Sequence, residues 1–419
     1  MQGKSKLLAA VAIAALSASA MPAFAKGTSN GTSQPMPADQ PAMQTGPSNA
    51  ELEARIEALE AEVQASEQRQ ATVNNQMSDW QSKLVGWWNN TTISGTAFID
   101  VSNIEHKSNG VKQTDTGTGF DLKRFYVAID HKFDDVWSAN ITTDVTYDST
   151  TKASQIFIKK AWLQAKVWDD MLTVRVGSSD LPWVPFAESL YGYRYVENTL
   201  IDRTKFGTSA DWGAHIFGKF ADGMFSYAFS VINGAGYKNI PIGNGANRSK
   251  SVDVEGRVNV NWEGFVLGVG GYSGKLGKDV QGTTTYHTAQ RLDAIAAYST
   301  SDIHAGIEYF KANDWNNVTT TTKDSADGFG GFASWKFMPQ FAVFGRYDYV
   351  KPNRDTNALL HDNYYNFGVT WSPAKIVDLS LVYKHDQASH GTIATSNGTI
   401  GGSVNGTYSE IGLFTQLKW

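Results

Sequence analysis

The chain ends on the stretch Thr407–Trp419, TYSEIGLFTQLKW. Apolar and polar residues alternate along it: Ile411, Leu413, Leu417 and Trp419 share one face with Thr415, and Glu410, Gly412, Gln416 and Lys418 share the other, with Phe414 as an exception. A period of two indicates a β-strand, and a terminal aromatic suits a membrane–water interface. A soluble strand can also alternate, but it would rarely end the chain on Trp. The stretch therefore predicts the closing strand of a transmembrane β-barrel, with its apolar face toward lipid.

The composition agrees with a barrel. The 419 residues have 12% aromatics and 39 Gly, and the mean hydropathy is only −0.32. A helical membrane protein would be more apolar, whereas only alternate residues of a barrel strand face lipid. The chain has no Cys, which excludes disulfide scaffolds, thiolate catalysis and CxxC redox sites.

Residues 1–25 have the plan of a secretory signal peptide. Lys4 and Lys6 form a charged start, an apolar core covers 7–20, and Ala-Phe-Ala at 23–25 is a cleavage site. A membrane anchor is the alternative, but this core is short and rich in Ala. No later run reaches the about 18 apolar residues that a spanning helix needs.

Two further segments precede the barrel. Residues 26–49 are rich in Gly, Ser, Thr, Pro, Asn and Gln, which predicts a flexible linker. Residues 50–87 carry a heptad seam of Leu52, Ile56, Leu59, Val63, Ser66, Gln70, Val73, Met77, Trp80, Leu84 and Trp87. The sustained spacing of 3.5 predicts a coiled coil, and a single amphipathic helix packed on the barrel is the alternative. We expect it to join protomers in the periplasm.

Sixteen alternating segments follow. They cover roughly 93–101, 121–133, 137–147, 156–167, 172–178, 208–220, 224–234, 251–262, 265–275, 287–300, 303–314, 326–337, 341–351, 363–373, 377–387 and 407–419. Short connections alternate with long ones at 102–120, 179–207, 235–250, 313–325 and 388–406. This predicts an all-β fold for residues 90–419, a 16-stranded antiparallel transmembrane β-barrel preceded by the α-helical coiled coil. An even strand count places both ends of the barrel in the periplasm.

The alternation also assigns the two faces of each strand. In 137–147, Trp137, Ala139, Ile141, Val145 and Tyr147 are expected to point outward, and Ser138, Asn140, Thr142 and Asp144 inward. The same reasoning turns Arg257 and Arg346 inward. A polar interior in a sixteen-stranded barrel implies a water-filled lumen.

Two stretches carry a family likeness, 121–147 and 158–220. Their motifs are Val174-Arg175-Val176-Gly177, Pro185-Phe186-Ala187-Glu188 and Asp202-Arg203. Together they resemble the phosphate-selective porin O/P family. The resemblance implies a homotrimer of sixteen-stranded pores, with loop three, residues 179–207, folded inward as the constriction. The N-terminal coiled coil also resembles that of a dicarboxylate porin family.

The candidate pore residues are basic. Those expected to line the pore and attract anions are Arg124, Lys160, Arg175, Arg194, Arg203, Lys205, Arg257, Arg291 and Arg346, and those expected to shape the constriction loop are Pro185, Phe186, Glu188 and Asp202. Rings of Lys or Arg favour anions. Acids share the same faces, however, and no ladder of closely spaced Arg is present. The same residues are therefore equally suited to ion pairs that hold the loop and the wall.

The expected function is passive diffusion of small hydrophilic solutes through the bacterial outer membrane, with anions such as phosphate as the solutes. A general or dicarboxylate-preferring porin and a structural or tethering protein are the alternatives. The eight His show no ligand spacing and nothing marks a nucleophile, so no metal, cofactor or enzyme activity is expected. The net charge is −5 without a basic run, so nucleic acid is not an expected partner. The expected partners are outer-membrane lipid, the solutes and two further copies of the chain.

Overall fold

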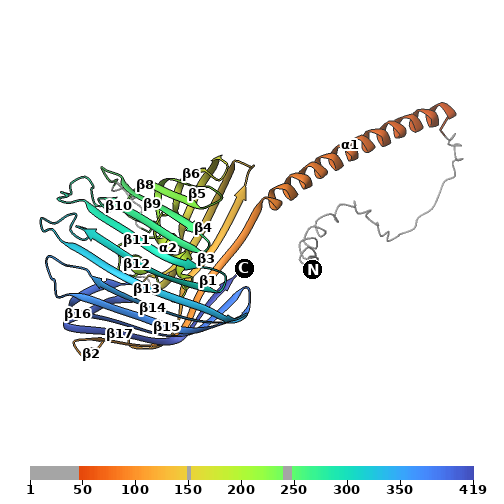
Figure 1. Cartoon of the computed structure of the whole chain (residues 1–419). Helices are drawn as coiled ribbons and strands as arrows, with labels where there is room; N and C mark the ends of the chain where they lie inside the picture. The colour runs from red at the N-terminus through yellow and green to blue at the C-terminus, as the bar shows by residue number, and fades with distance from the viewer. Residues whose placement is uncertain (1–46, 149–151, 239–247) are drawn as a thin grey trace, which may run out of the picture. The chain divides into compact units, whose positions relative to one another are not determined.

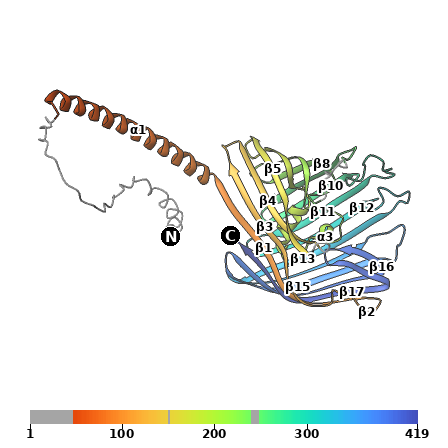
Figure 2. The same cartoon turned by 180° about the vertical axis from the view of Figure 1, so that it is seen from behind.

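The computed structural model describes residues 47–148, 152–238 and 248–419. The chain divides into two compact units between Met77 and Ser78. The helix α1 (Asn49–Asn89) crosses this boundary, and every strand belongs to the second unit (Figures 1 and 2). The expected signal peptide and almost all of the expected linker lie outside the described residues. Within those residues, no helix combines the length and the apolar character needed to cross a membrane.

The second unit is a closed antiparallel barrel. Its strands are β1 (Thr91–Ser108), β2 (Val111–Lys112), β3 (Gly117–Lys132), β4 (Trp137–Asp148), β5 (Ala153–Trp168), β6 (Leu172–Asp180), β7 (Ala210–Phe220), β8 (Phe225–Ile232), β9 (Asp253–Trp262), β10 (Phe265–Gly274), β11 (Ala289–Ser299), β12 (Ile303–Asn313), β13 (Ser325–Met338), β14 (Phe341–Lys351), β15 (His361–Ala374), β16 (Val377–Thr395) and β17 (Gly398–Lys418). β2 is a two-residue piece of the first connection, so sixteen of the described strands form the wall. β17 pairs with β1, which closes the sheet and confirms the predicted fold.

The closing strand alternates as its sequence predicts. Ile411 and Leu413 are exposed on the outer face, whereas Glu410 is buried on the inner face. The exception, Phe414, is buried inside the barrel, where the ammonium groups of Lys123 and Lys384 lie 4.5 and 4.3 Å from the centre of its ring. An aromatic ring tolerates an inward position here because cations lie over it.

One expected loop is a hairpin. The expectation of a long connection over 388–406 is wrong, because β16 continues to Thr395 and β17 begins at Gly398. Ile393 and Ile400 face each other in this extension and both are buried. Burial of these two side chains stabilises the extended hairpin. The sequence did not predict the hairpin, because the segment is rich in Gly and Ser. β1 likewise extends beyond the expected end at 101, to Ser108.

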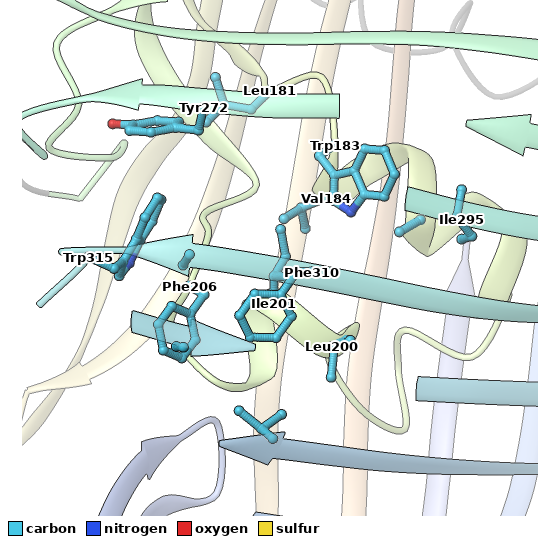
Figure 3. Packing of buried hydrophobic residues seen from close by; sticks show 14 of the residues in the cluster. Leu181, Trp183, Val184, Leu200, Ile201, Phe206, Tyr272, Ile295, Phe310 and Trp315 are labelled. Carbon is cyan, nitrogen blue, oxygen red and sulfur yellow. The ribbon is translucent and has the colours of Figure 1, made fainter. Parts of the chain in front are cut away.

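The connection between β6 and β7 forms two short helices, α2 (Val184–Tyr191) and α3 (Leu200–Arg203). α2 has Pro in its first turn and ends at Gly192, whose φ of 78° is the left-handed conformation that Gly adopts without strain. Trp183 and Ile201 of this connection pack with wall residues Ile295 and Phe310 in one buried apolar cluster (Figure 3). A sixteen-stranded barrel has room for this cluster because its own strands do not fill the lumen.

Candidate pore constriction

Arg203 of α3 is the most completely enclosed charge of loop three. Its side chain is 0% exposed, and its three guanidinium nitrogens donate to Asp348, Asp362 and Asp386 at 3.0, 2.7 and 3.1 Å. These carboxylates belong to three neighbouring strands, β14, β15 and β16. Burial by itself lowers the pKa of Arg203, but the three carboxylates raise it well above its usual value. The residue therefore holds loop three to this part of the wall.

Three arginines of the wall donate to backbone carbonyls of loop three. Arg257 Nε lies 2.8 Å from Pro182 O, Arg291 Nη1 lies 2.6 Å from Phe206 O, and Arg346 Nη1 lies 2.5 Å from the carbonyl oxygen of residue 198. Arg291 also pairs with Asp293, and Arg346 with Asp348. Charge-assisted hydrogen bonds of this kind are stronger than neutral ones. The sequence left open whether these arginines attract anions or hold the loop and the wall. Their contacts here are those of residues that hold loop three to the wall.

Glu197 adds a buried carboxylate to the same attachment. It accepts hydrogen bonds from the backbone N–H of Asn198 at 2.8 Å and the hydroxyl of Ser396 at 2.6 Å, and Lys384 lies 3.6 Å away. Burial alone would raise the pKa of Glu197, but Lys384, Ser396 and Lys123 lower it to about 2. The carboxylate is therefore ionised at neutral pH.

The four expected constriction residues all lie within loop three. Glu188 and Asp202 both pair with Arg194, the second at 3.6 Å. Burial lowers the pKa of Arg194, but these two acids raise it above its usual value. Pro185 is in the first turn of α2, and the ring of Phe186 lies 4.1 Å from the Arg257 guanidinium. Lys205 is exposed and has no ion pair among the described residues.

The opposite wall, β3 to β6, carries the other three expected residues. Arg124 pairs with Asp144 at 2.9 Å, and Lys160 pairs with Asp180 at 2.6 Å. Arg175 instead donates to the neutral side chains of Gln164 and Ser179, and its guanidinium lies over the rings of Trp162 and Phe217 at 4.0 and 4.8 Å.

Lys159 is a pore cation that sequence reasoning missed. It is 7% exposed, its Nζ donates to the Tyr126 hydroxyl at 3.1 Å, and it lies over the rings of Tyr126 and Tyr237 at 4.4 and 5.7 Å. The described part of the chain places no carboxylate within 4.0 Å of its Nζ. The register shifts by one residue between Thr142 and Thr143, so Lys159 is an extra residue in a β-bulge. Strict alternation assigns it to lipid, and only the bulge turns it inward.

Loop three and the opposite wall border a polar cavity of about 370 Å³. Its lining includes the expected residues Arg124, Asp202, Lys205 and Arg291, together with Tyr237 and Lys238, which the sequence did not single out. Lys238 lies over the ring of Phe157 at 5.1 Å, and Phe157 stacks on Tyr237. Residues from β3, β5, loop three and the connection after β8 therefore meet at one place in the lumen.

Comparisons with known proteins show the fold. No protein-family model matches the chain, and no curated protein matches it in sequence. The anion-selective porin from Comamonas acidovorans is 11% identical with a TM-score of 0.59, and the match covers 78% of this chain and 99% of that one. The outer membrane channel DcaP of Acinetobacter baumannii is 11% identical with a TM-score of 0.53, over 78% and 97%. OmpT of Vibrio cholerae in its trimer form is 11% identical with a TM-score of 0.54, over 78% and 99%. None of these matches singles out the phosphate-selective O/P family, and at such identities the likeness establishes that the chain has the fold of outer-membrane porins.

Proposed function

We propose that the chain is an outer-membrane porin, a water-filled channel through which small hydrophilic solutes diffuse passively, and that it prefers anions such as phosphate. The closed barrel with a polar lumen supports the channel. Loop three inside the barrel supports a constriction that limits solute size. A channel of this kind carries no catalytic step, so the proposed function is transport without chemistry.

The observation that carries the anion preference is the distribution of paired and unpaired cations. On the β14–β16 side, Arg203 and Arg346 are neutralised by buried aspartates. By contrast, no carboxylate of the described residues lies within 4.0 Å of Lys205 and Lys238, which line the polar cavity, or of Lys159 on β5. Fixed charges in a constriction act over less than the Debye length of about 10 Å at 0.1 M salt, so their local sign outweighs the net charge of the chain. Unpaired cations there favour anions.

Reconstitution in a planar bilayer tests this proposal. With a salt gradient, the zero-current potential of the native pore is expected to indicate anion preference. The triple variant Lys159→Gln, Lys205→Gln and Lys238→Gln is expected to shift it toward cations, most strongly at low salt. Lys219→Gln is the matched control, because Lys219 is exposed and already paired with Asp170. A native pore that prefers cations contradicts the anion preference, and a protein that conducts no ions supports the tethering alternative instead.

We further propose that three copies assemble and that α1 joins them as a periplasmic coiled coil. Within the described residues, the apolar seam positions Leu52, Ile56, Leu59, Val63 and Met77 of α1 are all exposed. A helix with an uncovered heptad seam gains stability by packing against copies of itself.

A further inference from the structure

The last hairpin of the barrel is longer than the membrane requires. β16 has 19 residues and β17 has 21. A tilted strand needs only about 9–11 residues to cross the hydrocarbon layer. β16 begins at Val377, directly after the short connection that follows Ala374, so its second half lies beyond the membrane on the side of the long connections. We call residues 391–402, the end of this hairpin, the flap.

The flap has no support from the neighbouring strands of the wall. The pairing of β15 with β16 ends at His361↔Ser389, and the pairing of β1 with β17 ends at Ser108↔Gly406. Within the flap, β16 and β17 pair only with each other. An isolated two-stranded hairpin is marginally stable in water, so the position of the flap depends on what its inner face contacts.

A bend marks the base of the flap. The register of β16 against β17 shifts between Ser389 and Gly391, so His390 is an extra residue in a β-bulge. Gly391 and Gly401 have φ of 149° and 124°, and a Cβ on Gly401 would collide with the carbonyl of Gly391. Bulges bend a strand, and here the bulge lies where the hairpin leaves the wall.

The inner face of the flap packs on loop three. Ile393 and Ile400 are buried in the same apolar cluster as Leu200 and Ile201 of loop three. Thr392, on the opposite face of the flap, is exposed. Since loop three lies inside the barrel, the flap extends over the lumen and covers part of its entrance.

The tip of the flap is attached to loop three by Ser396. Its backbone N–H donates to Arg203 O at 2.8 Å, and its hydroxyl donates to Glu197 Oε1 at 2.6 Å. The side-chain amide of Asn397 lies 3.5 Å from Asp386. These few polar contacts and the two isoleucines hold a hairpin whose edges are otherwise unpaired with the wall.

We infer that the flap is a hinged gate that sets how large a solute can enter from the side of the long connections. With Ser396 attached to Glu197 and Arg203, the flap narrows the entrance. When the tip is released, the flap swings at the bend of His390 and Gly391, and the entrance widens. This inference rests on the proposed porin function and adds a second size filter to loop three.

Cysteine accessibility tests the motion, because the chain has no Cys of its own. Ile400→Cys reports on the covered face of the flap, and Thr392→Cys is the matched reporter on its exposed face. Each protein is reconstituted in vesicles and treated with a small neutral thiosulfonate, and the labelled fraction is followed by mass. We expect the reaction at 400 to be at least tenfold slower than the reaction at 392. Ile393→Cys replaces Ile400→Cys if that variant does not fold.

Release of the tip is the second part of the experiment. Ser396→Ala removes the hydroxyl that donates to Glu197, so in the Ile400→Cys background it is expected to raise the labelling rate several-fold. Without the cysteine, it is expected to let vesicles swell in neutral sugars that are too large for the native pore. Ser403→Ala, an exposed serine of β17 outside the flap, is the control and should change neither result.

Equal labelling rates at 392 and 400 in the native background contradict the closed flap. A rate at 400 that Ser396→Ala leaves unchanged, or an unchanged size limit for sugars, shows that the flap is a fixed part of the wall and overturns the gate. Ion conductance of the same vesicles separates these outcomes from failure of the proposed function. Vesicles that do not conduct contradict the porin proposal, whereas conducting vesicles with an unchanged rate at 400 contradict the gate alone.

Discussion

At the scale of single residues, Lys159 has the contacts that most directly support the proposed anion preference. Its ammonium is buried beside two tyrosine rings, and the described residues give it no carboxylate within 4.0 Å. Lys159→Gln keeps a donor for Tyr126 and removes the charge. Unit charges about 4 Å apart interact by about 1 kcal/mol in water, so we expect the permeability ratio to fall toward cations by roughly fivefold or less.

The measurement is the zero-current potential across a salt gradient, and Lys159→Arg is the control because it retains the positive charge. A Lys159→Gln pore with the native potential would remove Lys159 from the proposed anion path.

The residue scale also shows what alternation can and cannot predict. It places Arg175 and Asp144 inside correctly, because the alternation of β6 and β4 is unbroken at these residues. Arg124 is also inside, but it lies beside Lys123, an extra residue in β3. Alternation fails at Lys159, because a bulge shifts the register by one residue. It also cannot select partners: Arg203 meets Asp348, a residue 145 positions away, and sequence spacing carries no information about such contacts.

At the scale of elements, loop three depends on the buried charge of Arg203. Arg203→Met keeps much of the volume but leaves Asp348, Asp362 and Asp386 buried without their shared cation. Removing one partner of a buried ion pair costs about 3–5 kcal/mol. We therefore expect the loop to detach, with a larger and noisier single-channel conductance and a lower thermal midpoint.

Arg194→Met is the comparison for this variant, because Arg194 pairs within loop three itself and retains partial exposure. Equal conductance in the native pore and the Arg203→Met pore would show that the apolar cluster alone holds the loop.

The carboxylate of Glu197 is expected to make the attachment of loop three depend on pH. Its pKa falls from 4.5 to about 2 on folding, so its ionised form stabilises the attachment fully above about pH 4.5, and that stabilisation is lost as pH falls toward 2. We expect conductance and its noise to be steady from pH 7 to about pH 4.5 and the noise to rise below that. Glu197→Gln has no such titration, so a native pore with the same acid response as this variant would contradict the assignment.

The helix α1 is expected to hold the copies together through its seam. Ile56→Asp combined with Leu59→Asp places charges at two exposed seam positions, so we expect fewer heat-labile oligomers of this variant than of the native chain on mild-detergent gels. Glu57→Gln lies between them and off the seam, and it is the control. Oligomers of unchanged heat stability would show that contacts between barrels suffice.

At the scale of the whole molecule, the alternating pattern is enough to predict the closed sixteen-stranded barrel, because every strand has one lipid face and one polar face. The early end of the β3–β4 ladder, at Val127↔Thr143, could not be predicted in this way. β4 keeps its alternation beyond that point, whereas β3 has an extra residue at Lys123. The position of loop three is also a property of the whole molecule, since its hydrogen bonds reach β9, β11 and β14.

Closure of the barrel predicts a role for the last residue. The Trp419 N–H donates to Gly95 O at 3.1 Å, the Gly95 N–H donates to Trp419 O at 3.0 Å, and the indole covers Gly95 so closely that any Cβ there would collide with it. The ring also lies 5.5 Å from that of Phe125 on β3.

Deleting Trp419 removes the last contacts of the seam between β17 and β1 together with an interfacial aromatic. We expect a lower yield of folded, heat-modifiable barrel in the outer membrane, with native conductance in the molecules that do fold. Trp419→Phe keeps the backbone pair and an aromatic ring and should restore most of the yield, whereas equal yields with and without Trp419 would show that the rest of β17 closes the barrel by itself.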